Sequence, residues 1–249
     1  MSDINNGKIE NMRIEPYTVG DLLHIYNRGN REMPIVYDEN DKWRFLKILR
    51  YLNNDISLPN PLREIEKLIQ SGEYPRFQWP KTWPPQKPLV KILDYCLMPN
   101  HFHLLLKEII KGGISKFMKK FGDGFTNYFN LKHQEIGRIF QGAYKGRVIK
   151  EEKVLQYIDA YIQVFNPFEL YPGGIEKSLK EFNKAFEFAL NYPFCSLGEC
   201  FGKRNLGIIE RDILKETFPN LEMYKEFAYD ALMVRNIREI LGKLAIEGI

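Results

Sequence analysis

The pattern of apolar and polar residues predicts short β-strands in the first two thirds of the chain. A strand running into an Asn-Arg-Gly turn is indicated at 21–30. Two β-rich runs separated by the turn pair Pro99-Asn100 predict a hairpin over 89–108. Another short strand is expected at 143–150.

Helical spacing of apolar residues falls between these runs. It predicts amphipathic helices over 38–55, 114–134 and 151–166, the last ended by Pro167. A Pro-rich segment at 56–88 indicates a surface insertion with one short helix over 61–70. The remainder is expected to be helical, at 175–190, 208–217, 221–232 and 234–247.

The order of the first six main elements is strand, helix, strand, strand, helix, strand. This βαββαβ order predicts an α+β, ferredoxin-like domain, in which an antiparallel sheet carries helices on one face. We therefore expect a catalytic or binding domain over 15–170, with the Pro-rich insertion at 56–88, and a helical C-terminal region over 171–249.

Composition places the chain among soluble globular proteins. Of its 249 residues, 44% are hydrophobic and 27% are charged, and no apolar run reaches the roughly 18 residues that a membrane-spanning helix needs. The N-terminus lacks the layout of a signal peptide, and the three cysteines form no CxxC pair. A cytoplasmic protein that does not enter the membrane is expected.

The positive charge of the chain is concentrated in one segment. Residues 111–150 contain nine Lys/Arg and two Asp/Glu, a net charge of +7, against +4 for the whole chain. Phenylalanines and tyrosines are interleaved with these cations, a combination that suits nucleic acid because cations bind phosphates and rings stack on bases. The alternative is a helix with a hydrophobic core face and a solvated lysine face.

His101 and His103 form an HxH pair in the predicted hairpin. Alternate residues of a strand share a face, so the two imidazoles would lie about 6 to 7 Å apart with Phe102 on the opposite face. One divalent ion can bridge such a pair. By itself the pattern is weak, and two imidazoles in an apolar segment remain the alternative.

A tyrosine helix follows the basic segment. Tyr157 and Tyr161 are four residues apart and share a helix face, and Gln163 and Asn166 lie near the helix end. A tyrosine phenol can attack phosphorus when a bound cation stabilises the phosphate and the leaving oxygen. Both tyrosines could equally be core residues of an amphipathic helix.

Four blocks of sequence resemble the single-tyrosine HUH transposases, in particular the REP-associated tyrosine transposases. They occur in the order and spacing of that family, within about residues 20–170: HIYNRGN, YCLMPNHFHLLLK, GRIFQGAYKGRVI and YIQVFNP. The resemblance implies that His101 and His103 bind a divalent metal ion, Mg²⁺ or Mn²⁺. It also implies that Tyr161 attacks a phosphate in single-stranded DNA next to a hairpin, giving a 5′-phosphotyrosine intermediate and DNA transposition.

The chain departs from the family at the third metal ligand. Many relatives have an asparagine four residues after the tyrosine, whereas Phe165 occupies that position here and Asn166 is the fifth residue. Either a bulge in the helix presents Asn166, or Gln163 replaces it. Tyr157 also remains open as the nucleophile.

The resemblance makes the basic segment the expected path of the DNA. Candidate contacts to a hairpin or its flanking bases are Asn27, Arg28, Arg138, Gln141, Lys145 and Arg147. His24 and His133 carry no comparable pattern.

These sequence features are compatible with three functions. The leading one is a metal-dependent transposase that nicks and rejoins single-stranded DNA, as a monomer or homodimer. The second is a non-catalytic, domesticated protein that binds hairpin DNA or RNA. A metallohydrolase with an activated water ranks last, because no Asp or Glu stands beside the HxH pair as a base.

Overall fold

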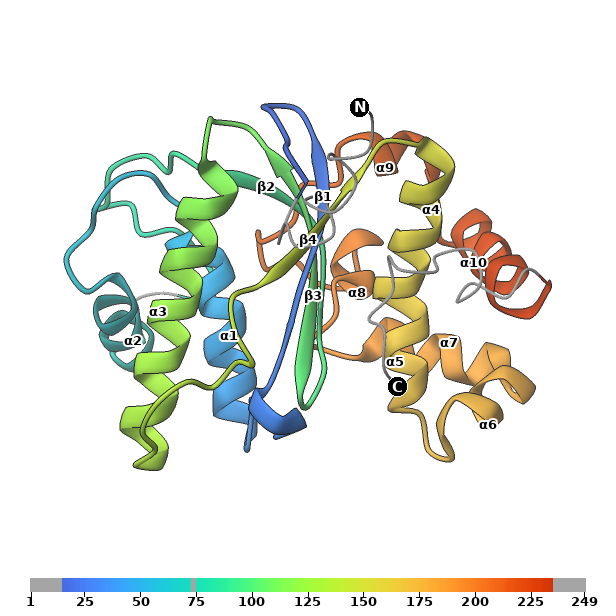
Figure 1. Ribbon diagram of the computed structural model, residues 1–249, viewed down its shortest axis with the longest axis horizontal. Helices are drawn as coiled ribbons and strands as arrows, with labels where there is room; N and C mark the ends of the chain where they lie inside the picture. The colour runs from blue at the N-terminus through green and yellow to red at the C-terminus, as the bar shows by residue number, and fades with distance from the viewer. Residues whose placement is uncertain (1–14, 73–74, 235–249) are drawn as a thin grey trace, which may run out of the picture.

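The computed structural model describes residues 15–72 and 75–234, and its centre is an antiparallel β-sheet (Figure 1). In the described residues the sheet has four strands in the order β2-β3-β1-β4, and each neighbouring pair is antiparallel. The strands are β1 (Leu22–Arg28), β2 (Val90–Leu97), β3 (His101–Glu108) and β4 (Lys145–Ile149). The predicted hairpin is β2–β3, closed by a hydrogen bond from Met98 N–H to His101 C=O.

Two long helices pack on one face of the sheet, left of the strands in Figure 1. They are α1 (Glu39–Leu52) and α3 (Gly113–His133), as the apolar spacing predicted. Asp38 and Asp41 form a capping box at the start of α1, which satisfies backbone N–H groups that the helix itself cannot pair. Between helices and sheet lies a phenylalanine-rich core that includes Phe45, Phe102 and Phe121.

The Pro-rich segment contains the predicted short helix, α2 (Pro61–Gln70). Side chains of α1 hold this segment: Arg44 donates a hydrogen bond to Glu66 at 2.8 Å, and the Tyr51 hydroxyl donates to the Gln78 carbonyl at 3.1 Å. Within the segment, Trp83 Nε1–H donates to Glu64. At the end of α1, the buried Asn53 amide donates to the Val90 carbonyl and accepts from Leu89 and Val90 N–H, which joins α1 to the start of β2.

The prediction of helices on one face of the sheet is incomplete, because the opposite face is covered by the tyrosine helix and the C-terminal helices (Figure 1). The tyrosine helix consists of α4 (Glu152–Ala160), a π-helical turn η2 (Tyr161–Phe165) and α5 (Asn166–Glu169). The prediction that Pro167 ends it is wrong. Proline lacks an N–H, and the wide π turn already leaves carbonyls near it without helical partners. The Cys195 thiol donates to two of these carbonyls, those of Ile162 and Gln163.

The C-terminal region is helical, but its elements are shorter than predicted. The span 175–190 is two helices broken at Glu181, and 208–217 is helical only at its end; the helix predicted at 234–247 falls outside the described residues, apart from Val234. The elements are α6 (Gly174–Lys180), α7 (Phe182–Asn191), α8 (Leu197–Cys200), α9 (Ile213–Thr217), α10 (Leu221–Tyr229) and a π turn η3 (Asp230–Val234). A short 3₁₀ turn, η1 (Asn30–Glu32), follows β1.

Backbone hydrogen bonds join the C-terminal region to the free edge of β2. Leu97 N–H donates to Phe194 C=O at 2.9 Å, and Ser196 N–H donates to Tyr95 C=O at 2.8 Å. Further along, Glu210 N–H donates to Ile92 C=O at 2.8 Å. The region therefore covers an otherwise unpaired sheet edge as well as a sheet face.

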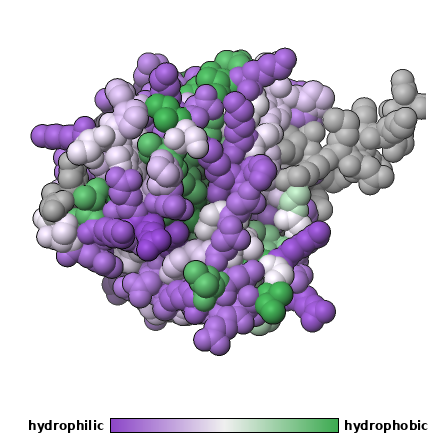
Figure 2. Space-filling view, turned by 90° about the vertical axis from the view of Figure 1, so that its left-hand side faces the viewer, coloured by the Kyte–Doolittle hydropathy of each residue, from purple (hydrophilic) through white to green (hydrophobic). Residues whose placement is uncertain are grey.

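Figure 2 looks at the side of the molecule where α2 and α3 lie, and shows a mainly hydrophilic surface with separated hydrophobic side chains. Two of the most exposed large hydrophobic residues are Leu131, near the end of α3, and Ile136, just beyond it. Among residues 15–72 and 75–234, no helix has the length and apolar character needed to cross a membrane.

Candidate active site

The two histidines of the HxH pair lie side by side at the start of β3. Both are buried, with 4% and 0% of their surface exposed, and their ring centroids are 5.2 Å apart. The hairpin turn orients the first one: His101 Nδ1–H donates to Asn100 Oδ1 at 2.7 Å. This hydrogen bond leaves the other ring nitrogen of His101, Nε2, with a free lone pair.

The π turn determines the position of Asn166, which the sequence left uncertain because one extra residue separates it from Tyr161. Asn166 N–H and its side-chain Nδ2–H both donate to the Tyr161 carbonyl, the latter at 2.9 Å, so the extra residue between them is taken up by an i→i+5 turn. The Asn166 side chain is 0% exposed, and its contact with the His101 imidazole raises the pKa of that histidine.

Three buried polar atoms of this group lack a hydrogen-bond partner within the described part of the chain: His101 Nε2, His103 Nε2 and Asn166 Oδ1. Buried polar atoms are nearly always paired, and leaving one unpaired costs about 1–3 kcal/mol. Two imidazole nitrogens and an amide oxygen form a donor set that divalent cations accept. The residues present therefore fit the metal ion that the sequence motifs imply.

Electrostatics keep both imidazoles neutral. Burial and, to a smaller extent, the positive charge of Arg28 lower the pKa of His101 to about 4, outweighing the contact with Asn166, which raises it. Burial also holds the pKa of His103 well below its usual value, helped by His24, His101 and Arg28. Neutral imidazole is the form that binds a metal ion.

Tyr161 lies directly against the histidines. Its ring meets the His103 ring edge-on, with centroids 5.3 Å apart and an interplanar angle of 90°, and it stacks on Phe165 at 5.4 Å. Tyr157 lies one turn earlier and packs against Phe227 of α10, with centroids 5.5 Å apart. The two tyrosines therefore have different surroundings although both are buried.

Gln163 faces a different group of residues. Its Nε2–H donates to Asp159, and its Oε1 accepts a hydrogen bond from the Ser196 hydroxyl at 3.3 Å. Both ends of this amide are thus hydrogen-bonded to other residues, and of the two candidates for a third ligand only Asn166 has a buried oxygen without a partner in the described residues and a contact with His101.

Sequence reasoning missed a second buried polar group, formed by Asp94 of β2, Asp159 of α4 and Tyr224 of α10. Both carboxyls are 0% exposed. Burial, and for Asp94 also the negative charge of Asp159, raises the pKa of each carboxyl, so that the pair retains a proton more readily than two exposed acids would. The three residues are far apart in sequence and follow no local motif.

Within the described residues, no cluster of three His, Cys, Asp or Glu side chains could hold a metal ion. The site around His101 and His103 differs from such clusters because its third candidate ligand is an amide.

Comparison with known proteins identifies the segment that carries these residues. Residues 86–164 match the family model described as "Transposase IS200 like". This segment is an IS200-like transposase domain. The match spans β2, β3, α3, β4 and most of the tyrosine helix, so it includes both histidines and Tyr161 and ends two residues before Asn166. It confirms the family that the sequence motifs indicated, and that family is one of DNA transposases.

A solved structure also resembles the chain. It is described as "Structure of the REP associates tyrosine transposase bound to a REP hairpin"; the two chains are 14% identical, the alignment covers 80% of this chain and 88% of that chain, and the TM-score is 0.38. Among curated proteins, no match was found.

The sheet carries cations on the same face as the histidines. In the antiparallel registers Arg28 pairs with His101 and Tyr26 with His103, while Lys145 pairs with Tyr26 and Arg147 with His24. Paired residues of antiparallel strands share a face. Arg28, Lys145 and Arg147 therefore lie beside the candidate metal ligands, although sequence separates them widely.

A pocket of about 270 Å³ lies at this edge of the sheet. Four of the predicted DNA-contacting residues line it together, namely Asn27, Arg28, Gln141 and Lys145. Arg147 and the exposed Arg138 do not line it. The Asn27 amide donates to the Gly142 carbonyl at 3.0 Å, which holds the 140–144 segment against the end of β1.

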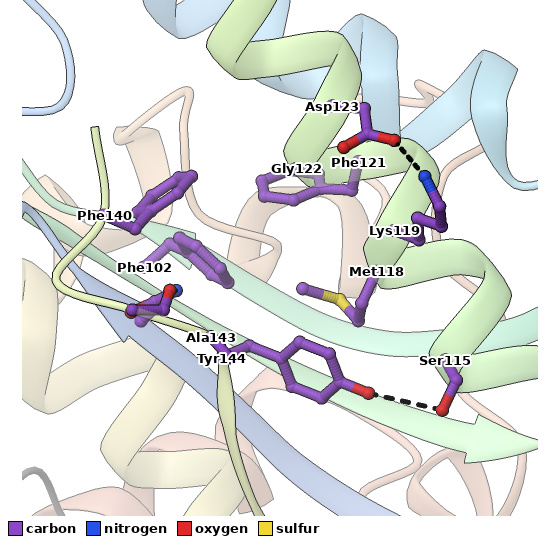
Figure 3. Close-up of a pocket in the computed structure, with 12 residues that line it drawn as sticks. Phe102, Ser115, Met118, Lys119, Phe121, Gly122, Asp123, Phe140, Ala143 and Tyr144 are labelled. Carbon is purple, nitrogen blue, oxygen red and sulfur yellow. Dashed lines mark hydrogen bonds and ion pairs between the residues drawn. The ribbon is translucent and has the colours of Figure 1, made fainter. Parts of the chain in front are cut away.

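A second pocket, of about 360 Å³, lies on the other sheet face, between α3 and the 140–144 segment (Figure 3). Phe102, Phe121 and Phe140 form its aromatic side, and Lys119 and Asp123 form an ion pair of 2.6 Å at its rim. Phe102 is the residue between the two histidines, so this pocket is separated from them by the sheet itself.

Proposed function

We propose that this protein cleaves and rejoins single-stranded DNA next to a hairpin, with Tyr161 as the nucleophile and a divalent metal ion, Mg²⁺ or Mn²⁺, as cofactor. The observation that carries the proposal is the group of three unpaired buried atoms beside the Tyr161 ring: His101 Nε2, His103 Nε2 and Asn166 Oδ1. These atoms would hold the ion. When bound, it would neutralise phosphate charge and stabilise the leaving oxygen.

The chemistry is a transesterification at phosphorus. Tyr161 Oη loses its proton to water and forms a bond to the scissile phosphorus, while the bond from phosphorus to the 3′-oxygen breaks. The 3′-oxygen takes up a proton and becomes a free hydroxyl, and the 5′-phosphate stays on the tyrosine. A later 3′-hydroxyl can attack this phosphotyrosine and restore a phosphodiester, so rejoining needs no ATP.

Charge and position suit the remaining candidates to binding the DNA backbone. Arg28, Lys145 and Arg147 lie on the sheet face of the histidines, where they can contact phosphates flanking the cleaved bond. Asn27 and Gln141 line the adjoining pocket and suit contacts to a base or sugar, and Arg138 extends the positive charge beyond it. The hairpin itself is proposed from the sequence motifs.

The catalytic unit is proposed to span 15–170, as a ferredoxin-like domain with an insertion at 56–88, followed by the helical region 171–249. Since Tyr161 and His103 of one chain are in ring contact, a monomer or each subunit of a homodimer can hold a complete site.

Two tyrosine variants test the assignment. The protein is incubated with Mn²⁺ and a labelled single strand that carries a hairpin, and covalent adducts are separated on a denaturing gel. We expect Tyr161→Phe to abolish the adduct while retaining hairpin binding, and the matched control Tyr157→Phe to keep the adduct. An adduct that survives in Tyr161→Phe sinks the proposal.

The same experiment examines the other functions. Hairpin binding by the unaltered protein without any Mn²⁺-dependent cleavage would indicate the non-catalytic binder. Release of free 5′-phosphates without an adduct would indicate a metallohydrolase. Both outcomes contradict the role proposed for Tyr161.

A further inference from the structure

We propose that His24 is a positioning residue that holds His103 in the orientation and tautomer needed to bind the metal ion; this inference depends on the metal site of the proposed function. His24 lies on β1, next to β3, and is separated from His103 by 79 residues in sequence. It lies outside the segment that matches the transposase family model.

The contact between the two imidazoles is direct. His24 Nε2 lies 2.8 Å from His103 Nδ1, and the two rings are nearly coplanar, with centroids 5.1 Å apart and an interplanar angle of 15°. Both side chains are 0% exposed. A hydrogen bond of this length between two buried rings has one proton, which sits either on His103 Nδ1 or on His24 Nε2.

The two placements of that proton have opposite consequences. If His103 Nδ1–H donates to His24 Nε2, then His103 Nε2 keeps its lone pair and can bind a cation. If His24 Nε2–H donates instead, a neutral His103 carries its own hydrogen on Nε2 and cannot act as a ligand there. Metal binding thus requires His24 to be the hydrogen-bond acceptor, which fixes the tautomer and the ring plane of His103.

The two candidate histidine ligands follow the same hydrogen-bond pattern. His101 Nδ1–H donates to Asn100 Oδ1, and His103 Nδ1–H would donate to His24 Nε2, so each Nε2 is left for the same ion. Both Nε2 atoms are among the buried atoms without a hydrogen-bond partner in the described residues. His133 is different: it pairs with Asp41 at 2.9 Å, on the opposite side of the sheet.

The test measures the affinity of the metal-free protein for Mn²⁺ by calorimetry. We expect His24→Phe, which keeps an aromatic ring but has no acceptor, to weaken binding about 10- to 100-fold, the usual loss when such an outer-shell partner is removed. His24→Gln, whose amide oxygen can accept the bond, should restore part of the affinity. The matched control His133→Phe should leave the affinity unchanged.

A second measurement needs no variant. Long-range ¹H–¹⁵N spectra of the metal-free, unaltered protein report which nitrogen of His103 carries hydrogen, and we expect Nδ1. Hydrogen on Nε2, or equal Mn²⁺ affinity in His24→Phe and the unaltered protein, would overturn the inference alone. Failure of the unaltered protein to bind Mn²⁺, or binding that survives His101→Ala with His103→Ala, would overturn the proposed metal site and this inference with it.

Discussion

The two faces of the sheet are built from the same strands but have opposite chemistry. The face under α1 and α3 is apolar: Phe102, Phe121 and their neighbours pack ring against ring, and the candidate ligands are absent from that core. The face under the tyrosine helix buries histidines, an asparagine and two carboxyls, several of whose atoms are unpaired in the described residues. One face stabilises the fold, while the other gives up stability for a site.

The apolar face should show the largest effect on stability. Phe121 is 1% exposed and contacts the rings of Phe45 and Phe102. We expect Phe121→Ala to lower the free energy of unfolding by about 3–5 kcal/mol, since the cavity is lined by rigid rings. Urea unfolding measures this. Leu131→Ala on the same helix, where the side chain is 86% exposed, should change it by less than about 0.5 kcal/mol. Equal losses in the two variants would contradict the comparison.

The face under the tyrosine helix, called the site face, should show the next largest effect. This effect is a dependence of the free energy of unfolding on pH. The pKa of His101 is about 4 in the folded protein against 6.5 for the free side chain. Below pH 6.5 the unfolded chain therefore binds more protons than the folded one, and stability falls as the pH falls toward 4. The contribution of His101 is about 3 kcal/mol over that window.

The measurement compares the metal-free protein with His101→Gln by urea unfolding at several pH values. The variant should lose about 3 kcal/mol less between pH 6.5 and 4, while the two proteins should have parallel curves above pH 7. Parallel curves at every pH would show that the His101 imidazole is not held neutral by its surroundings.

The smallest effect is expected at the edge of the face under the tyrosine helix. It concerns the binding of DNA and not the stability of the fold. We expect Lys145→Ala with Arg147→Ala to weaken binding of a single strand with a hairpin and to reduce the slope of log K against log salt by about 0.7 for each lost phosphate contact. Fluorescence anisotropy at several KCl concentrations measures the slope. Lys119→Ala, on the other face and paired with Asp123, is the control. An equal loss of slope in the control would mean that DNA binding depends on the total positive charge and not on the sheet face that carries it.

Local pattern alone predicted much of this arrangement. The hairpin, α1, α2, α3 and β4 lie within a few residues of their predicted bounds, because each depends on turn residues or on a spacing of apolar side chains that neighbours in sequence determine. The same alternation placed Phe102 opposite His101 and His103.

The rest depended on contacts between distant segments. Sequence could not favour Asn166 over Gln163 as the candidate third ligand. The choice depends on a π turn and on the hydrogen bonds that Gln163 makes with Asp159 and Ser196. His24 showed no motif, since its partner is 79 residues away.

Sequence by itself determined the candidate residues for the chemistry, the strand that pairs the two histidines and the helix that carries Tyr161. Only the tertiary structure decided which of those groups meet. It turned Asn166 toward the histidines, set Tyr157 against α10, and placed Arg28, Lys145 and Arg147 on the site face. The physical reason is that periodicity fixes the face on which a side chain lies, whereas its partners depend on how separate elements pack and on which buried polar atoms find hydrogen bonds.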